Sequence, residues 1–416
     1  MFSPGKLLGL ILILLGPFLQ AQVLNLQIDV FTHLNTVNDF RIENNHLYAA
    51  TTGGLVVYDL TSNELDKYTT ADGLFDHQIT ALERDGRGLV ILGTLNGFVS
   101  FWDESSGIFL NDDNLRNSEI VDLLAIEDTL WVLSDKLVSV YLYNDELERY
   151  QFRESYQEFG TEVDKFHHLE YANQRIWVGS NIGLFNAPAN FLKYNLYAID
   201  NWQKMTTGDG LPGNNVYSLY FDENLNLLWM ATSNGVAKYD FQTFTTFQNG
   251  LQTRVVKHLV VQNGNVYVAE NNNIFRLQNN TFERLVKIPV APITALYVDE
   301  NENVWYGLEK RGLYNFTSGT RLYLDGPLDN YIGEVLKDSQ GRIWLTSSLI
   351  KVERRQGLYL LTDQGFINYY FFGGNNNIFR AMNNTISVYE DDEGHVWVGS
   401  WGGGVIVFDP ELQMTP

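Results

Sequence analysis

The sequence predicts an all-β fold, a β-propeller made of nine four-stranded repeats. Short runs of β-branched and aromatic residues, bounded by Gly, Asn and Asp, follow one another along the chain, as strands and tight turns do. A turn–strand–turn–strand unit recurs at spacings of 38 to 53 residues, and propeller blades have repeats of this length. Six of the nine tryptophans fall at one position of the unit, so the repeat is a structural one.

The repeated position lies in the middle of an apolar strand in every copy. We expect its side chain to pack between neighbouring blades, because burying a large ring removes much apolar area from water. The nine residues at this position are Tyr48, Ile91, Trp131, Trp177, Trp229, Tyr267, Trp305, Trp344 and Trp397.

The second copy shows how the residues specify a blade. Residues His77–Glu83 alternate apolar and polar side chains, as a half-buried strand does. The next strand, Leu89–Gly93, is almost wholly apolar, which suits a strand between two blades. The pair Asn96-Gly97 favours a two-residue hairpin turn into Phe98–Asp103, and Ile108–Leu110 supplies a short outer strand.

Three copies depart from the pattern. The third has Asp135-Lys136 where other copies have a glycine turn, and the eighth carries the insertion Lys351–Arg355. The fourth is followed by a long connection through Trp202. Loops that break a repeat either carry specificity or drift neutrally on the surface.

The two ends of the chain suggest how the ring closes. The last copy stops at Asp409 with seven residues left, so its outermost strand is predicted to be missing. Residues Ile28–Leu34 resemble an outermost strand with no partner before it. These features favour one ring closed by the N-terminal strand. Since propellers typically have four to eight blades, the alternative is a seven-bladed ring followed by the start of a second.

Composition limits the class of partner. The chain has 28 Lys and Arg against 50 Asp and Glu, a net charge of −22, which repels nucleic acids and anionic membranes. There is no cysteine, which excludes disulfides, thiolate metal sites and a cysteine nucleophile. We expect no cofactor.

The N-terminus reads as a secretory signal over residues 1–21, with the propeller domain over residues 22–416. Lys6 precedes the apolar run Leu7–Leu19, and Ala21 offers a small residue for cleavage. A membrane anchor is the alternative, although Gly16-Pro17 interrupts the run. No later stretch is long and apolar enough to span a bilayer. We therefore expect a periplasmic or secreted protein without membrane insertion after cleavage.

The repeats resemble those of a known family. The segments GHVWVGSWGGGVIVFD (394–409), NLLWMATSNGVAKYD (226–240) and NHLYAATTGGLVVYD (45–59) are similar to the propeller repeat of bacterial two-component regulators. The connections TTADGLFDHQITAL (69–82) and TTGDGLPGNNVYSL (206–219) match that family's Gly-Leu link between blades. This resemblance implies a periplasmic sensor domain, often one that responds to glycan fragments. The run from Leu47 to Leu82 also resembles the propeller accessory proteins of the type IX secretion machinery.

No linear motif points to catalysis or to a metal. Acidic turns begin at Asp222 and Asp299, but positions six and twelve lack the Gly and Glu of a calcium loop. The adjacent His167-His168 pair is expected to be ordinary surface. No serine elbow, HExxH motif or phosphate-cradling loop occurs. We therefore expect a protein that is not an enzyme and holds no metal.

The candidate binding site is a loop face around a channel mouth. Trp401 occupies a turn where a small polar residue is usual, and an exposed aromatic ring there suits stacking on a sugar or peptide. We expect the same face to carry His77, Asn96, Lys136, Asn234, Arg254 and Arg311. The leading hypothesis is a non-enzymatic recognition or sensor module that binds an oligosaccharide or an envelope protein. The alternatives are a structural component of an export complex and, third, a carbohydrate-active propeller enzyme.

Overall fold

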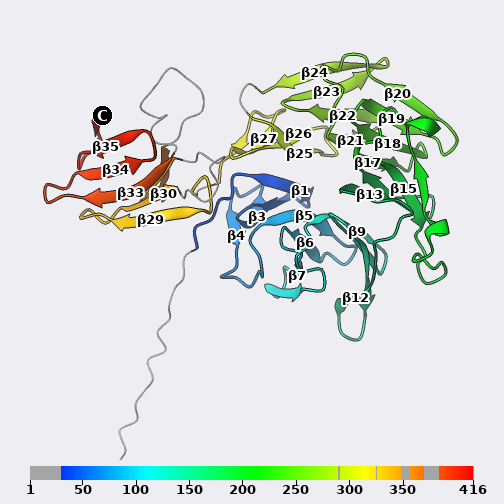
Figure 1. The fold of residues 1–416 in the computed structure, drawn as a ribbon, viewed down its shortest axis with the longest axis horizontal. Coiled ribbons are helices and arrows are strands. Elements are labelled where there is room, and N and C mark those ends of the chain that lie inside the picture. The colour runs from blue at the N-terminus through cyan, green and yellow to red at the C-terminus, as the bar shows by residue number, and fades with distance from the viewer. Residues whose placement is uncertain (1–29, 289–290, 325, 348–356, 370–383, 416) are drawn as a thin grey trace, which may run out of the picture.

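The protein is built from nine four-stranded antiparallel sheets in the computed structural model (Figure 1). The structure describes residues 30–288, 291–324, 326–347, 357–369 and 384–415. Within each sheet the strands are neighbours in chain order. The all-β propeller fold and its nine four-stranded repeats are therefore confirmed. Over these same ranges, no helix has the length and apolar character needed to cross a membrane.

The first three sheets come from the N-terminal third of the chain. The first contains β1 (Val37–Glu43), β2 (His46–Thr51), β3 (Gly54–Asp59) and β4 (Leu65–Tyr68). The second contains β5 (Ile79–Arg84), β6 (Val90–Thr94), β7 (Val99–Asp103) and β8 (Ile108–Asp112). The third contains β9 (Ile120–Ile126), β10 (Thr129–Ser134), β11 (Val138–Asn144) and β12 (Arg149–Tyr156).

The next three sheets continue the same order, with two short 3₁₀ turns beside the fourth. The fourth contains β13 (Phe166–Ala172), β14 (Arg175–Ser180), β15 (Gly183–Pro188) and β16 (Gln203–Met205), with η1 (Ile199–Asn201) and η2 (Thr207–Asp209). The fifth contains β17 (Val216–Asp222), β18 (Leu227–Thr232), β19 (Gly235–Tyr239) and β20 (Phe244–Phe247). The sixth contains β21 (His258–Gln262), β22 (Asn265–Glu270), β23 (Asn273–Gln278) and β24 (Thr281–Lys287).

The last three sheets complete the set. The seventh contains β25 (Ile293–Val298), β26 (Val304–Leu308), β27 (Gly312–Asn315) and β28 (Arg321–Leu322). The eighth contains β29 (Ile332–Lys337), β30 (Ile343–Ser347), β31 (Leu358–Thr362) and β32 (Gly365–Tyr369). The ninth contains β33 (Thr385–Glu390), β34 (Val396–Ser400), β35 (Gly404–Phe408) and β36 (Met414–Thr415).

The first seven sheets form a closed ring. The first strand of each packs against the first strand of the next, and β25 returns to contact β1. Trp305 of the seventh blade is buried in one cluster with Val37 and Phe40 of the first. A single ring of nine blades, which the sequence favours, is therefore not formed. The alternative arrangement is the one observed, with the eighth and ninth blades beside the ring (Figure 1).

The N-terminal segment joins the seventh blade, not the ninth. The backbone carbonyl of Asn35 accepts a hydrogen bond of 2.8 Å from the Gly312 N–H, which extends the chain beside β27. The described part of Ile28–Leu34 forms no strand. The ninth blade obtains its outer strand from β36, which pairs with β35. Two predictions from the sequence are therefore wrong: the N-terminal segment does not close the ring as a strand of the ninth blade, and the ninth blade does not lack its outer strand.

The eighth and ninth blades pack face to face around Trp344, which is fully buried against Phe408. In the ring, second strands such as β10 and β26 pack against the first strand of the following blade. Trp397 holds the same repeat position on the ninth blade but is 44% exposed. The expected burial of the repeat tryptophans is confirmed at the other five positions and wrong at Trp397. The predicted signal and the insertion Lys351–Arg355 lie outside the described residues.

Candidate functional site

A polar channel runs through the centre of the seven-bladed ring. Its wall is made of the first strands β1, β5, β9, β13, β17, β21 and β25, and it encloses about 710 Å³. In six of these strands the pairing register shifts after the first residue, as between Val37 and Asp39 or between Phe166 and His168. A bulge of this kind turns two successive side chains toward one side. Tandem polar residues therefore face the channel.

The pairs that line the start of the channel are mostly polar. They are Asn38-Asp39, His167-His168, Tyr217-Ser218 and Lys257-His258. The expectation that His167-His168 is ordinary surface is wrong, because both imidazoles line the channel. The sequence carries a signal for this site, since a tandem of polar residues opens several of the first strands.

Three carboxylates of the channel bind the backbone of the following blade. Asp39 accepts a hydrogen bond of 3.0 Å from the Leu82 N–H, and Asp122 accepts one of 2.6 Å from the Leu169 N–H. Glu170 accepts a bond of 3.0 Å from the Phe221 N–H. Burial raises the pKa of Asp39 and of Glu170 above the ordinary range. These side chains serve to join blades.

A fourth carboxylate is held by an arginine. The Glu83 Oε2 atom lies 2.7 Å from Nη2 of Arg41, and Arg41 Nε donates to the Leu82 carbonyl at 3.3 Å. Burial raises the pKa of Glu83 to about 7, although the Arg41 charge acts in the opposite direction. The pair thus neutralises much of the charge in this part of the channel.

The channel is also lined by imidazoles and a lysine. Burial lowers the pKa of His167 to about 4, with the Lys165 and Lys257 charges adding to the effect. Burial likewise lowers the pKa of His258 to about 4, and Lys257 again contributes. At neutral pH both imidazoles are uncharged, and each has one donor and one acceptor nitrogen. His167 interacts with the Asn215 side chain and His258 with the Ile293 backbone, which leaves the second nitrogen of each ring. The exposed Lys257 ammonium beside them carries the positive charge.

Six of the seven residues predicted for the loop face lie on the ring. Alternate strands run in opposite directions, so turns between second and third strands share one end of the blades with the connections between blades. We call this end the connection face. It carries His77, Asn96, Lys136, Asn234, Arg254 and Arg311. The first strands that line the channel begin at this end.

Two pairs of these residues are brought together. Asp76 accepts a hydrogen bond of 2.9 Å from Asn96 Nδ2 and lies 4.0 Å from His77 Nδ1. The turn that contains Asn234 meets Arg254 through the Gly235 N–H, which donates to the Arg254 carbonyl at 2.7 Å. The side chain of Asn234 also donates to the Pro212 carbonyl at 2.9 Å. Both asparagine side chains therefore hold a turn to a connection.

The other predicted residues are apart from these pairs. Lys136 is exposed and borders a hollow of about 760 Å³ lined also by Glu158 and Glu162. Arg311 is half-buried in the turn between β26 and β27. Trp401 follows β34 and is 68% exposed. It belongs to the ninth blade, so the single channel mouth shared by all seven residues is not formed.

The two acidic turns use their carboxylates for turn geometry. Asp222 Oδ1 accepts a hydrogen bond of 3.1 Å from the Leu225 N–H. Asp299 Oδ1 accepts bonds from the Asn301 and Asn303 N–H groups at 2.9 and 2.8 Å. Within the described residues, no group of three or more His, Cys, Asp or Glu side chains is placed to hold a metal ion.

Comparison with known proteins supports the propeller assignment. Residues 379–402 match the family model described as two component regulator propeller. No curated protein matches the sequence significantly. The solved structure of PorZ, described as an essential bacterial surface component of the type-IX secretion system of Porphyromonas gingivalis, has a TM-score of 0.70 at 17% identity. The match covers 93% of this chain and 52% of PorZ, so this chain spans about half the length of that structure.

Two further structures match with lower scores. The WD40 β-propeller domain of Doa1 has a TM-score of 0.52 at 11% identity, covering 68% of this chain and 93% of that domain. The extracellular domain of the hybrid two-component system BT3049 from B. thetaiotaomicron has a TM-score of 0.39 at 14% identity, covering 93% of this chain and 53% of that one. The chain thus has a β-propeller fold and carries, at residues 379–402, the two-component regulator propeller repeat that its sequence suggests.

Proposed function

We propose that this protein is an exported, non-enzymatic recognition propeller of sensor or accessory type. It binds a glycan fragment or a protein partner on the connection face of the ring. The observation that carries the proposal is how the polar side chains of the channel are engaged. The carboxylates Asp39, Asp122 and Glu170 are engaged by the backbone of neighbouring blades. The Lys257 ammonium and the neutral His258 imidazole remain near the mouth.

This arrangement favours binding over catalysis. General acid–base chemistry needs a group whose proton is available near the operating pH. The two imidazoles have pKa values of about 4. Glu83, although burial raises its pKa to about 7, is only 7% exposed and is held by Arg41, which leaves a ligand little access to its carboxylate. Neutral imidazoles and an ammonium suit hydrogen bonding to hydroxyl, carbonyl or acidic groups of a ligand.

The positive groups of the connection face give the ligand a preferred character. Lys136, Arg254 and Lys257 are exposed on a protein of net charge −22. An acidic or strongly polar group of the partner would be attracted to them while the rest of the surface repels it. Trp401 offers a separate stacking surface on the ninth blade.

The uncovered face of the ninth blade favours a second candidate, a structural or accessory role in an envelope or secretion complex. Tyr389, Trp397 and Val405 are 64%, 44% and 53% exposed. Contiguous exposed apolar side chains mark protein–protein interaction sites. PorZ, which shares the fold at a TM-score of 0.70, is described as a component of a secretion system.

A thermal-unfolding screen tests the first candidate. The chain lacking residues 1–21 is heated with a panel of oligosaccharides, and a ligand at a hundred times its dissociation constant adds about 2.7 kcal/mol to stability. We expect the shift to shrink in Lys257→Gln and Arg254→Gln and to persist in Arg284→Gln, an exposed outer-strand residue. A shift lost only in Trp401→Ala would move the site to the ninth blade.

Three further measurements test the accessory role, the export of the protein and the absence of catalysis. A flat panel combined with capture of an envelope protein by the wild type, but not by Trp397→Asp, would favour the accessory role. Mass spectrometry of the protein from culture fractions tests export and signal removal. Turnover of a polysaccharide that is lost on mutation of Glu83 or His258 would contradict the non-enzymatic proposal.

A further inference from the structure

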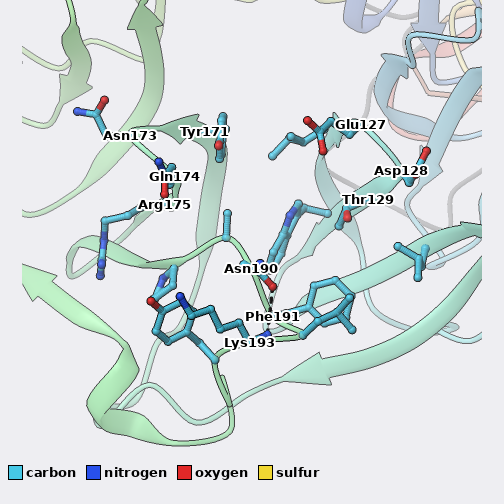
Figure 2. Close-up of a pocket in the computed structure, with 17 residues that line it drawn as sticks. Glu127, Asp128, Thr129, Tyr171, Asn173, Gln174, Arg175, Asn190, Phe191 and Lys193 are labelled. Atoms are coloured by element: carbon cyan, nitrogen blue, oxygen red, sulfur yellow. Dashed lines mark hydrogen bonds between the residues drawn. The ribbon is translucent and has the colours of Figure 1, made fainter.

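A groove between the third and fourth blades opens at the end of the ring opposite the connection face. It has a volume of about 790 Å³. The turn between β9 and β10 forms one wall, and the turn between β13 and β14 forms another (Figure 2). The third wall is the segment after β15, which begins the long connection that passes through Trp202.

The long connection is held in place by its own contacts. The Ala189 N–H donates to the Gln174 carbonyl at 3.0 Å. The Trp202 indole is buried and donates to the Leu196 carbonyl at 2.9 Å. The first bond ties the start of the connection to the turn before β14. Leu196 and Trp202 are buried in the core shared by the third and fourth blades, so the groove is formed before any ligand enters. A preformed site loses little entropy on binding.

The floor of the groove is aromatic. Trp131 is buried there, and the ring of Phe191 meets it edge to face with centroids 6.2 Å apart. Tyr194 is 38% exposed at the rim. The accessible rings of Phe191 and Tyr194 suit packing against the C–H face of a sugar, while the buried Trp131 supports Phe191.

Two cations lie in the same region of the groove. Figure 2 shows Arg175 and Lys193 on the side away from Glu127 and Asp128. Neither cation forms an ion pair with a carboxylate of the described chain. Other arginines that are half-buried like Arg175 do pair with a carboxylate, namely Arg84, Arg276 and Arg342.

The guanidinium of Arg175 is only partly satisfied. Its Nε donates to Asn186 Oδ1, which leaves the two terminal nitrogens for another acceptor. Burial lowers the pKa of Arg175 below its ordinary value, as expected for a cation without a compensating anion. The Lys193 ammonium lies 5.2 Å from the Tyr194 ring centroid. A ligand carboxylate would complete this part of the groove.

Amide side chains supply the remaining contacts. Asn173 and Gln174 form the turn before Arg175, both with left-handed φ of 51° and 61°, and their side chains are exposed. On the facing wall, Asp128 is bound by Arg87, while Glu127 faces the groove. Paired donors and acceptors beside aromatic rings suit the hydroxyl groups of a sugar.

We propose that this groove binds an acidic oligosaccharide through a hexuronate residue. The carboxylate of the hexuronate is held by Arg175 and Lys193, the ring lies over the Phe191 side of the floor, and its hydroxyls meet Asn173, Gln174 and Glu127. The site is distinct from the connection face, so it does not depend on the function proposed above.

The test is calorimetric titration of the chain lacking residues 1–21 with trigalacturonate and trimannuronate, and with β-1,4-galactotriose as the neutral control. We expect at least one acidic trisaccharide to bind, with galactotriose at least tenfold weaker. The Lys193 side chain is exposed, so the Lys193→Gln variant should fold normally. It and Arg175→Gln should each weaken binding about tenfold or more, since charge-assisted hydrogen bonds to a carboxylate are lost.

Control variants locate the site. Arg284→Gln removes the same charge from an exposed outer strand and should leave the affinity unchanged, while Lys257→Gln and Arg254→Gln report on the connection face. The proposal is overturned if neither acidic trisaccharide binds, if galactotriose binds equally well, or if the connection-face variants rather than the groove variants reduce affinity. Binding of a tetraglutamate peptide in place of both trisaccharides would also overturn it, and would assign the groove to a protein partner.

Discussion

Asn35 and Leu324 close the ring by a two-way clasp across 289 positions of sequence. The Leu324 N–H donates to Asn35 Oδ1 at 2.9 Å, and Asn35 Nδ2 donates to the Leu324 carbonyl at 2.5 Å. The side chain therefore imitates the paired bonds of a neighbouring strand. Asn35 is fully buried, so no water can replace it.

Removing this clasp should destabilise the ring. Asn35→Ala leaves the buried N–H and carbonyl of Leu324 without partners, which we expect to cost roughly 2–4 kcal/mol of the free energy of unfolding. Urea unfolding followed by circular dichroism measures the change. Asn224→Ala, at an exposed turn, is the control and should change stability by no more than about 0.5 kcal/mol. Equal effects of the two substitutions would contradict the clasp.

The same repeat position should respond differently in neighbouring blades. Trp344 is fully buried and Trp397 is 44% exposed, although each indole donates to the aspartate six residues before it. Trp344→Ala should cost about 3–5 kcal/mol, the usual loss for a buried tryptophan. Trp397→Ala should cost much less, because this side chain is already partly exposed and its removal loses less buried apolar area. Hydrogen exchange across β30 and β34 reports each blade separately, and a larger loss at Trp397 would show that its face is covered in solution.

Stability should fall in acid because of His258. Its pKa is about 4 in the folded chain and about 6.5 when unfolded. Between these values the unfolded chain binds a proton that the folded chain does not. The contribution of the neutral His258 to the free energy of unfolding is thus complete above pH 6.5. It is lost as the pH falls toward 4, by up to about 1.4 kcal/mol per pH unit.

Replacing the imidazole isolates this effect from other groups. Glu83, whose pKa is raised to about 7, works in the opposite sense over part of the same range. The difference in free energy of unfolding between wild type and His258→Gln should therefore shrink as the pH is lowered from 7 to 4. A difference that stays constant would mean that the imidazole titrates normally in the channel.

Two glycines of the second blade should differ sharply. Gly97 has φ of +83°, and a Cβ there would lie 2.0 Å from the Leu115 carbonyl oxygen. Gly97→Ala should cost at least about 2 kcal/mol because both backbone strain and a steric clash oppose it. Gly86 has no heavy atom within 4 Å of an added Cβ, so Gly86→Ala should be nearly neutral. Thermal unfolding of the two variants makes the comparison.

The sequence by itself determined the blade. Strand patterns, turn residues such as Asn96-Gly97 and the repeat tryptophans are local features, because each records which side of a short strand is covered. They sufficed to predict nine four-stranded sheets and the common face of six loop residues. The aspartates of the acidic turns were also readable as turn formers, since their bonds reach only a few residues ahead.

Only the tertiary structure decided how many blades close a ring. Closure depends on the small rotation between packed sheets summed over the ring, and on contacts such as Asn35 with Leu324 that no local pattern encodes. Trp344 and Trp397 occupy equivalent sequence positions, yet one is buried and the other exposed because only one has a blade beyond it. The channel and the groove likewise arise between blades, where side chains distant in sequence meet.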